Sequence, residues 1–316
     1  MKNIAIIGCG NHVNKNIIPV LNKLNWNIKY IVVRDSRKYR NHGLAEIIVD
    51  DVAMVLADST VDIIYIATPI STHYKYAKEF LSHGYNVICE KPITVTTVEL
   101  DDLNKIAKDM NCNLCQVEMY KYHKQFQKLK EVLTSGVYGE LKQATFSFKI
   151  PHLSQADIRY DPTQAGGALY DVGFYPISAA ITLFPTAQLE YSTLRSEPGY
   201  KVDLQGFALL TVSEQTLIHC QWSIGSCYEN KIVLDFLTHR VVAERAFSKP
   251  SSLVTNIQVY SSNGDSEIIE IGCDDHFFNM FSYFLSRENS FFEIDKTTNK
   301  TIGILTDIFH TNRLKV

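Results

Sequence analysis

Short apolar runs alternate with amphipathic segments through the first third of the chain. Residues 63–67 and 86–89 are apolar runs of strand type, and residues 72–83 between them place their apolar positions at helical spacing before Gly84, a helix-stop residue. A strand, a helix and a second strand in this order form a right-handed crossover. The two strands are therefore expected to be parallel neighbours.

Both of these strands end in polar residues and a proline. Thr68 and Pro69 follow the first strand, and Glu90, Lys91 and Pro92 follow the second. Open parallel sheets bind their ligands outside the carboxyl ends of the strands. The pattern thus predicts that the Lys91 ammonium lies at the edge where such a sheet binds small molecules.

The same alternation continues on both sides of this unit and then changes character. Further strands are predicted at residues 2–7, 28–33, 47–49 and 113–118, with helices from the turn at residues 8–13 through 24, around 52–56 and over 99–110. From residue 141 the texture is β, with strands predicted at 143–150, 189–195, 206–211, 217–222, 231–237, 256–261 and 268–271 and helices at 167–184 and 300–311. The pair Asn263–Gly264 indicates a hairpin turn between two of these strands.

These patterns predict an α/β protein of two domains. Residues 1–120 form a Rossmann dinucleotide-binding domain, and residues 121–316 form an α+β domain with an open, mostly antiparallel sheet. A broad open sheet with apolar residues on both faces exposes a patch of the kind that usually marks an oligomer interface. We therefore expect a homo-oligomer, a dimer or tetramer, that assembles through the second sheet.

Composition restricts the partners and the compartment. The chain has 316 residues, 46% of them hydrophobic, and a net charge of −3, which gives no electrostatic reason to expect nucleic acid or an anionic membrane as a partner. Most of the seven cysteines lie in strand-like runs or glycine turns, which favours free thiols in a reducing cytoplasm. Cys112 and Cys115 form a C-x-x-C without a second pair or spaced histidines, so we expect two thiols there and no metal site.

The turn after the first strand has a phosphate-binding pattern. Gly8-Cys9-Gly10-Asn11-His12-Val13 matches G-x-G-x-x-G/A except that valine stands in place of the third small residue. Two glycines let backbone N–H groups approach a pyrophosphate at the start of a helix. Gly8, Gly10, Asn11 and His12 are the expected cofactor contacts here.

The loop after the second strand is where a dinucleotide domain selects its cofactor. An acidic side chain there accepts the ribose hydroxyls of NAD, whereas arginine accommodates the 2′-phosphate of NADP. Arg34, Ser36 and Arg37 resemble a phosphate-binding site, whereas Asp35 is the acidic residue expected for NAD. NADP(H) is favoured and NAD(H) is the alternative. Thr68, Pro69 and His73 are expected beside the nicotinamide end, and Glu90 is a further expected cofactor contact.

Several motifs in order resemble the glucose–fructose oxidoreductase / inositol dehydrogenase (Gfo/Idh/MocA) family over nearly the whole chain. They are the glycine turn, Ala67-Thr68-Pro69 with His73, Glu90-Lys91-Pro92, the stretch from Glu118 to His123, the turn from Gly136 to Leu141, and the segment from Gly166 to Pro176. Residues 157–162 and 221–225 further resemble sugar-nucleotide 3-ketoreductases. Dihydrodiol dehydrogenases share the Asp-x-Gly-x-Tyr-Pro signature, and inositol dehydrogenases carry histidine where this chain has Tyr175.

The resemblance implies an NAD(P)-dependent oxidoreductase that transfers hydride to or from a sugar carbonyl or hydroxyl. Asp171 and Tyr175 lie four residues apart on one predicted helix and so share a face. Tyr175 is the expected proton donor, Lys91 would favour its phenolate and bind the developing oxyanion, and Asp171 would orient Lys91 or a substrate hydroxyl. Lys91 could instead be the acid itself. Tyr120, His152 and Arg159 are weaker candidates for substrate contacts.

A nucleotide-sugar 3-ketoreductase is therefore the predicted function. The alternatives are a dihydrodiol or free-sugar dehydrogenase, and a catalytically silent NAD(P)-sensing regulator. Retention of both Lys91 and Tyr175 counts against the silent regulator.

Overall fold

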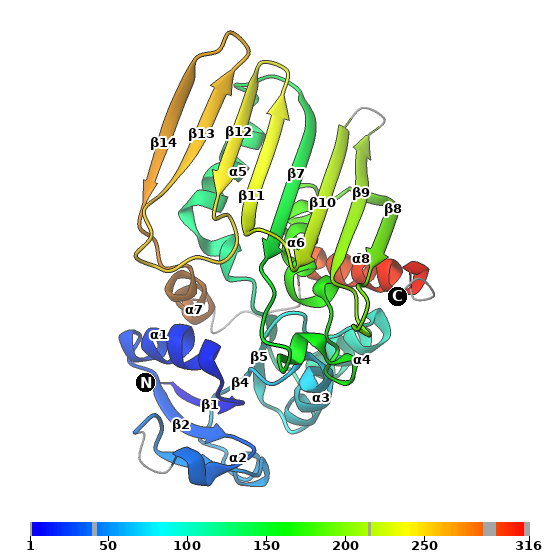
Figure 1. The fold of residues 1–316 in the computed structure, drawn as a ribbon. Coiled ribbons are helices and arrows are strands. Elements are labelled where there is room, and N and C mark those ends of the chain that lie inside the picture. The colour runs from blue at the N-terminus through cyan, green and yellow to red at the C-terminus, as the bar shows by residue number, and fades with distance from the viewer. Residues whose placement is uncertain (1, 40–42, 214–215, 287–294, 313–316) are drawn as a thin grey trace. The chain divides into compact units, whose positions relative to one another are not determined.

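The first sheet consists of six parallel strands in the order β3-β2-β1-β4-β5-β6 (Figure 1). A computed structural model describes residues 2–39, 43–213, 216–286 and 295–312. The strands are β1 (Asn3–Ile7), β2 (Asn27–Val32), β3 (Ile47–Val49), β4 (Ile63–Ile66), β5 (Asn86–Cys89) and β6 (Leu114–Gln116). The order reverses between β1 and β4, and this is the switch point at which such sheets bind ligands.

Contacts divide the chain into two units. The first comprises Met1–Val117 and Phe277–Lys296, and the second comprises Glu118–His276 and Thr297–Val316. The helices of the first unit are α1 (Ile18–Lys23), α2 (Ala53–Leu56), α3 (His73–Ser82), α4 (Thr97–Asp109) and nearly all of α7 (His276–Ser286). Phe281 of α7 contacts the rings of Trp26 and Tyr65, so this late helix packs within the first unit.

The second sheet has eight strands in the order β14-β13-β12-β11-β7-β10-β9-β8, and Figure 1 shows them side by side. Every neighbouring pair is antiparallel except β7 and β10, which are parallel. The strands are β7 (Leu141–Ile150), β8 (Gln188–Arg195), β9 (Gln205–Ser213), β10 (Thr216–Ile224), β11 (Glu229–Phe236), β12 (His239–Glu244), β13 (Thr255–Ser261) and β14 (Ser266–Gly272). The helices of this unit are α5 (Lys124–Ser135), α6 (Phe174–Leu183) and nearly all of α8 (Lys296–Asn312).

Helices cover one face of the second sheet. Helix α6 packs on β7 and β10, and α5 contacts β13. Along β11, buried residues alternate with half-buried ones, as expected when alternate side chains face the helices. The core of this unit therefore lies between the sheet and these helices, and the other face of the sheet is open.

The predicted fold class is confirmed, with local differences in the elements. The predicted hairpin turn at Asn263–Gly264 joins the antiparallel strands β13 and β14. The predicted helix over 167–184 begins instead as a π-helical turn, Leu169–Gly173, before α6. Helix α5 and strand β12 were not predicted, although Phe126, Leu129 and Val132 of α5 recur at helical spacing.

Candidate active site

The glycine turn at the switch point is shaped for a phosphate. Gly8 has φ +92°, and a Cβ built on it would lie 2.8 Å from the carbonyl oxygen of Ala67, so the turn lies against the end of β4 in a way that only glycine permits. A Cβ built on Gly10 would meet nothing within 4 Å. A closely packed first glycine and open space at the second fit the pyrophosphate cradle of a dinucleotide.

The carboxylate of Glu90 lies next to this turn. Its Oε1 lies 2.8 Å from Nε2 of His12 and also accepts a hydrogen bond from the hydroxyl of Tyr65. Burial alone would raise the pKa of Glu90, but His12, Tyr65 and Lys91 together lower it to about 2. A negative charge is thereby held next to Lys91 at the carboxyl edge of the sheet.

His73 joins the two loops that follow β4 and β5. Its ring is buried, with Nδ1 2.8 Å from the carbonyl oxygen of Pro92 and Nε2 2.9 Å from that of Thr68. Burial lowers the pKa of His73. This arrangement favours a role for His73 in holding the two loops together. The predicted contact of His73 with the cofactor stays a prediction, and the burial of the ring does not favour it.

The loop after β2 already neutralises its acidic residue. Arg37 binds both carboxylate oxygens of Asp35, with Nε 2.8 Å from Oδ1 and Nη2 3.2 Å from Oδ2. Arg34 is exposed, and Ser36 is half-buried. A paired Asp35 beside an exposed guanidinium fits a 2′-phosphate better than it fits a pair of ribose hydroxyls.

The second unit carries the predicted tyrosine and aspartate on one helical segment. Tyr175 is 9% exposed, and its ring packs against Phe148, Phe247 and Tyr120 at centroid distances of 5.3, 5.9 and 6.2 Å. Asp171 forms an ion pair with Arg159, and Asp171 is the main reason that the pKa of Arg159 is raised. Arg159 is thus one partner of Asp171, and it also binds Asp157.

Two other residues predicted to contact the substrate, Tyr120 and His152, contact other side chains of this unit. The hydroxyl of Tyr120 lies 2.7 Å from Oγ of Ser178, and its ring is fully buried. His152 stacks on Tyr200 with the ring planes 13° apart. The burial of Tyr120 does not favour a substrate contact, whereas the half-exposed ring of His152 leaves that prediction open.

The sequence analysis missed Asp203, which fixes the start of the tyrosine-bearing helix. Its Oδ2 accepts the backbone N–H of Leu169 at 2.7 Å, and its carbonyl oxygen accepts that of Ala168 at 2.8 Å. A Cβ on Gly167 would lie 2.3 Å from Oδ1 of Asp203, so glycine is required there. The sequence carries one signal for Asp203, which is that it stands alone between the apolar residues Val202 and Leu204. An ionisable group among apolar neighbours needs hydrogen-bond partners if it is buried.

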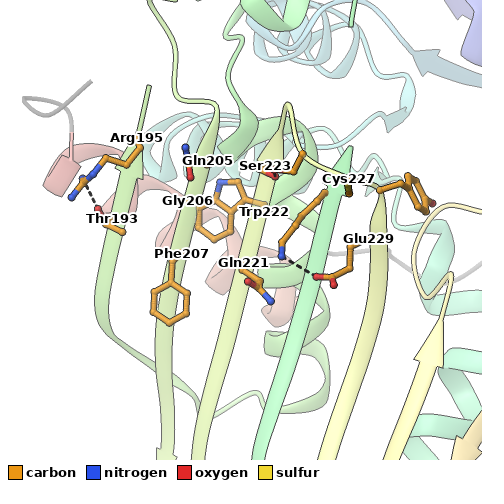
Figure 2. A pocket seen from close by; sticks show the side chains of 13 residues that line it. Thr193, Arg195, Gln205, Gly206, Phe207, Gln221, Trp222, Ser223, Cys227 and Glu229 are labelled. Atoms are coloured by element: carbon orange, nitrogen blue, oxygen red, sulfur yellow. Dashed lines mark hydrogen bonds and ion pairs between the residues drawn. The ribbon is translucent and has the colours of Figure 1, made fainter. Parts of the chain in front are cut away.

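A separate pocket of about 500 Å³ lies on the open face of the second sheet (Figure 2). Gln221, Trp222 and Ser223 of β10 line it, and the ring of Trp222 also lies against Gly173. Lys149 forms an ion pair of 3.1 Å with Glu229 at its rim. None of the predicted site residues lines this pocket.

The switch point, the glycine cradle and the basic loop after β2 define a dinucleotide-binding protein. Two family models match the chain: "Oxidoreductase family, NAD-binding Rossmann fold" over residues 2–119, and "GFO/IDH/MocA C-terminal domain" over residues 126–243. The chain belongs to the Gfo/Idh/MocA family of oxidoreductases. The predicted family and enzyme class are thus confirmed, and the protein is an NAD(P)-dependent oxidoreductase.

The similar proteins include reductases of deoxysugars. The dTDP-3,4-didehydro-2,6-dideoxy-alpha-D-glucose 3-reductase of Actinomadura kijaniata is 30% identical over 254 residues, which are 79% of this chain and 76% of that protein. The enzyme of the same name from Streptomyces antibioticus is 28% identical over 71% of this chain and 69% of its own length. The structure of KijD10, a 3-ketoreductase from Actinomadura kijaniata in complex with NADP and TDP-benzene, superposes with a TM-score of 0.90 at 24% identity and covers 99% of this chain and 97% of that one.

Within the described ranges, every helix is too short or too polar to cross a bilayer.

The titration of Asp203 yields a testable pH dependence of stability. Burial raises the pKa of Asp203 from 3.8 to about 7 against the lowering effect of its backbone donors. A raised carboxyl pKa stabilises the fold below the unfolded pKa, and this stabilisation is lost as the pH rises through 7. We expect the free energy of unfolding to fall by up to about 4 kcal/mol between pH 4 and pH 8 from this group alone.

Asp203→Asn keeps an oxygen for Leu169 but does not titrate, so urea unfolding of this variant should vary less over the same pH range. Asp307→Asn, at an exposed position on α8, is the matched control and should keep the wild-type dependence. An Asp203→Asn variant with the wild-type slope would contradict the assignment.

Proposed function

We propose that this protein is an NADPH-dependent 3-ketoreductase of a nucleotide-linked deoxysugar. The observation that carries the proposal is the placement of Lys91 directly after β5, at the carboxyl edge of the switch-point sheet and next to the ionised Glu90. The similarity to two dTDP-sugar 3-reductases over more than two thirds of the chain supports the substrate class.

The chemistry requires a hydride, a proton and stabilisation of the oxygen that becomes negative. The bound cofactor would supply the hydride. The phenol of Tyr175 donates its proton to the carbonyl oxygen, so the ketone becomes a secondary alcohol and the tyrosine becomes a phenolate that solvent reprotonates. Lys91 donates a hydrogen bond to the same oxygen and favours the phenolate by its charge.

Tyr175 and Asp171 have different surroundings, which suits different roles. The ring of Tyr175 is held by aromatic neighbours and has little freedom to turn, which favours precise placement of its hydroxyl. Asp171 is held by Arg159, so we propose that this ion pair presents its carboxylate to a sugar hydroxyl. Lys91 as the proton donor is the alternative for the acid.

The cofactor preference follows from the loop after β2. Arg37 occupies the carboxylate of Asp35, which would otherwise repel a 2′-phosphate and accept the ribose hydroxyls of NAD. Arg34 is exposed at the same loop and is available for that phosphate. NADP(H) is therefore the proposed cofactor, and the KijD10 structures include NADP complexes.

The cofactor assignment predicts that NADPH binds at least roughly tenfold more tightly than NADH, since a charged hydrogen bond contributes on the order of 1.5–3 kcal/mol. Arg34→Ala should remove most of this preference by weakening NADPH and leaving NADH little changed. Fluorescence titration of the full-length protein measures both constants.

Lys38→Ala, an exposed cationic position on the same loop, is the control for non-specific charge effects. Binding of NADH alone would show that Asp35 holds the ribose and that the assignment is wrong.

The catalytic assignment predicts a loss of turnover without a loss of cofactor. Lys91→Ala and Tyr175→Phe should each lower kcat by about 10²- to 10⁴-fold, the usual contribution of a positioned acid or oxyanion donor. The dissociation constant for NADPH should stay within about threefold. Steady-state kinetics with a dTDP-linked keto sugar, or oxidation of the corresponding alcohol, measures the effect.

Lys105→Ala, on the exposed side of α4, should behave as wild type. The same assay with free sugars separates the second candidate, since the NADP-dependent D-xylose 1-dehydrogenase 2 of Haloferax volcanii is 29% identical over 200 residues. Cofactor binding without turnover of any sugar would favour a regulator.

We also propose that the protein works in the reducing cytoplasm, where its seven free cysteines would stay reduced.

We further propose that copies of the chain associate through the open face of the second sheet. On the open face of the sheet Tyr191 and Leu217 are 54% and 41% exposed. Light scattering should give a molar mass of at least twice that of one chain, and Leu217→Lys should lower it because a buried lysine opposes association. A monomeric wild type would contradict this interface.

A further inference from the structure

A three-residue contact spans the switch point of the first sheet. His12 lies in the turn after β1, Tyr65 lies on β4, and Glu90 follows β5. His12 and Tyr65 both contact Oε1 of Glu90, so two side chains fix the carboxylate at the carboxyl edge of the sheet. Fold topology places the ligand crevice between β1 and β4, which is the place that this contact crosses.

The second carboxylate oxygen of Glu90, Oε2, can accept further hydrogen bonds. Among the described residues its Oε2 accepts only the backbone N–H of Lys91, at 3.4 Å, which is a long bond. The side chain of Glu90 is 15% exposed, so few water molecules can replace the hydrogen bonds that Oε2 does not make to the protein. A mostly buried carboxylate with one satisfied oxygen is suited to act on a charge in the crevice.

The neighbours of Glu90 leave its negative charge in place. Nδ1 of His12 lies 3.0 Å from the amide nitrogen of Asn16, and Nε2 lies 2.8 Å from Oε1 of Glu90, so the ring is held between these two side chains. The phenol of Tyr65 donates a hydrogen bond but cancels no charge, and His12 keeps Glu90 ionised by lowering its pKa. Lys91 is the cation at this carboxylate, and its ammonium is committed by the proposed mechanism to the substrate oxygen.

We propose that Glu90 makes the protein discriminate between the two oxidation states of its cofactor, favouring the oxidised form. The nicotinamide ring carries a positive charge when oxidised and none when reduced, whereas the rest of the dinucleotide is unchanged. A fixed anion at the crevice therefore attracts only the oxidised ring, and His12 is a positioning residue for that anion. This inference rests on the proposed function, because it requires a nicotinamide at this edge of the sheet.

The discrimination would favour the reductive direction. Hydride leaves the reduced ring as the ring becomes positive, so an interaction that strengthens during transfer stabilises the transition state and the bound product. An opposite charge within about 4–6 Å commonly shifts an ionisation equilibrium by 1–3 units, which corresponds to at least a tenfold preference.

The first experiment replaces the charge and keeps the shape. Glu90→Gln should weaken binding of NADP⁺ by about tenfold or more and change that of NADPH by less than about threefold, in titrations of the full-length protein. Glu79→Gln, on the neighbouring helix α3, is the matched control and should alter neither. Equal weakening of both forms would show that Glu90 only supports the fold, and would overturn the proposal.

A second pair of variants leaves Glu90 intact. His12 has a side chain that is 43% exposed, so His12→Gln and His12→Lys should both fold; the first keeps a neutral donor and the second adds a cation beside Glu90. An added cation attracts the shared phosphates of both cofactor forms equally, so the ratio of the two dissociation constants isolates the ring charge. His12→Lys should shift this ratio toward NADPH by severalfold relative to His12→Gln, and an unchanged ratio would contradict the proposal.

These outcomes are separable from failure of the proposed function. If the wild type binds neither form, the nicotinamide assignment itself is wrong. If it binds both and neither variant changes the ratio, only the role of Glu90 is wrong.

Discussion

The parallel pairing of β1, β4 and β5 is the constraint on which the candidate cofactor site depends. Parallel strands end at one edge, so the residues that follow them meet there whatever their separation in sequence. Gly8 packs against the end of β4 because its missing side chain lets the turn approach Ala67. Glu90 can then reach His12, which lies in the turn after β1. The cradle and the charge beside Lys91 thus follow from one hydrogen-bonding pattern.

Two buried carboxyl groups show how donors decide the charge of a buried acid. Glu90 receives two side-chain donors and lies beside a lysine, and its pKa is lowered to about 2. Asp203 is more deeply buried and receives mainly backbone donors, and its pKa is raised to about 7. Burial opposes ionisation in both, and only nearby charge and strong donors overcome it. The first therefore acts as a fixed anion, and the second as a support for the helix that carries Tyr175.

Short-range patterns were enough to predict most of the first sheet and the motifs at its edge. The run at residues 86–89 is β5, and the residues after it carry the family's signature, because strand periodicity and motif order are local properties. Contacts between distant residues were not accessible in this way. The pairing of Arg159 with Asp171, the cap from Asp203 and the packing of α7 on β4 depend on tertiary packing that no local window contains. The hydrogen bonds by which His73 joins the loops after β4 and β5 are likewise contacts that no local window contains.

The proposed mechanism depends on Lys91 and Tyr175 acting on one carbonyl oxygen. A crystal structure of the full-length protein with NADP⁺ and an unreactive dTDP-linked sugar tests this most directly. We predict that Nζ of Lys91 and the hydroxyl of Tyr175 both lie within hydrogen-bonding distance, about 3 Å, of the same sugar oxygen. A complex in which either group points away from that oxygen while the sugar lies next to the nicotinamide would contradict the mechanism.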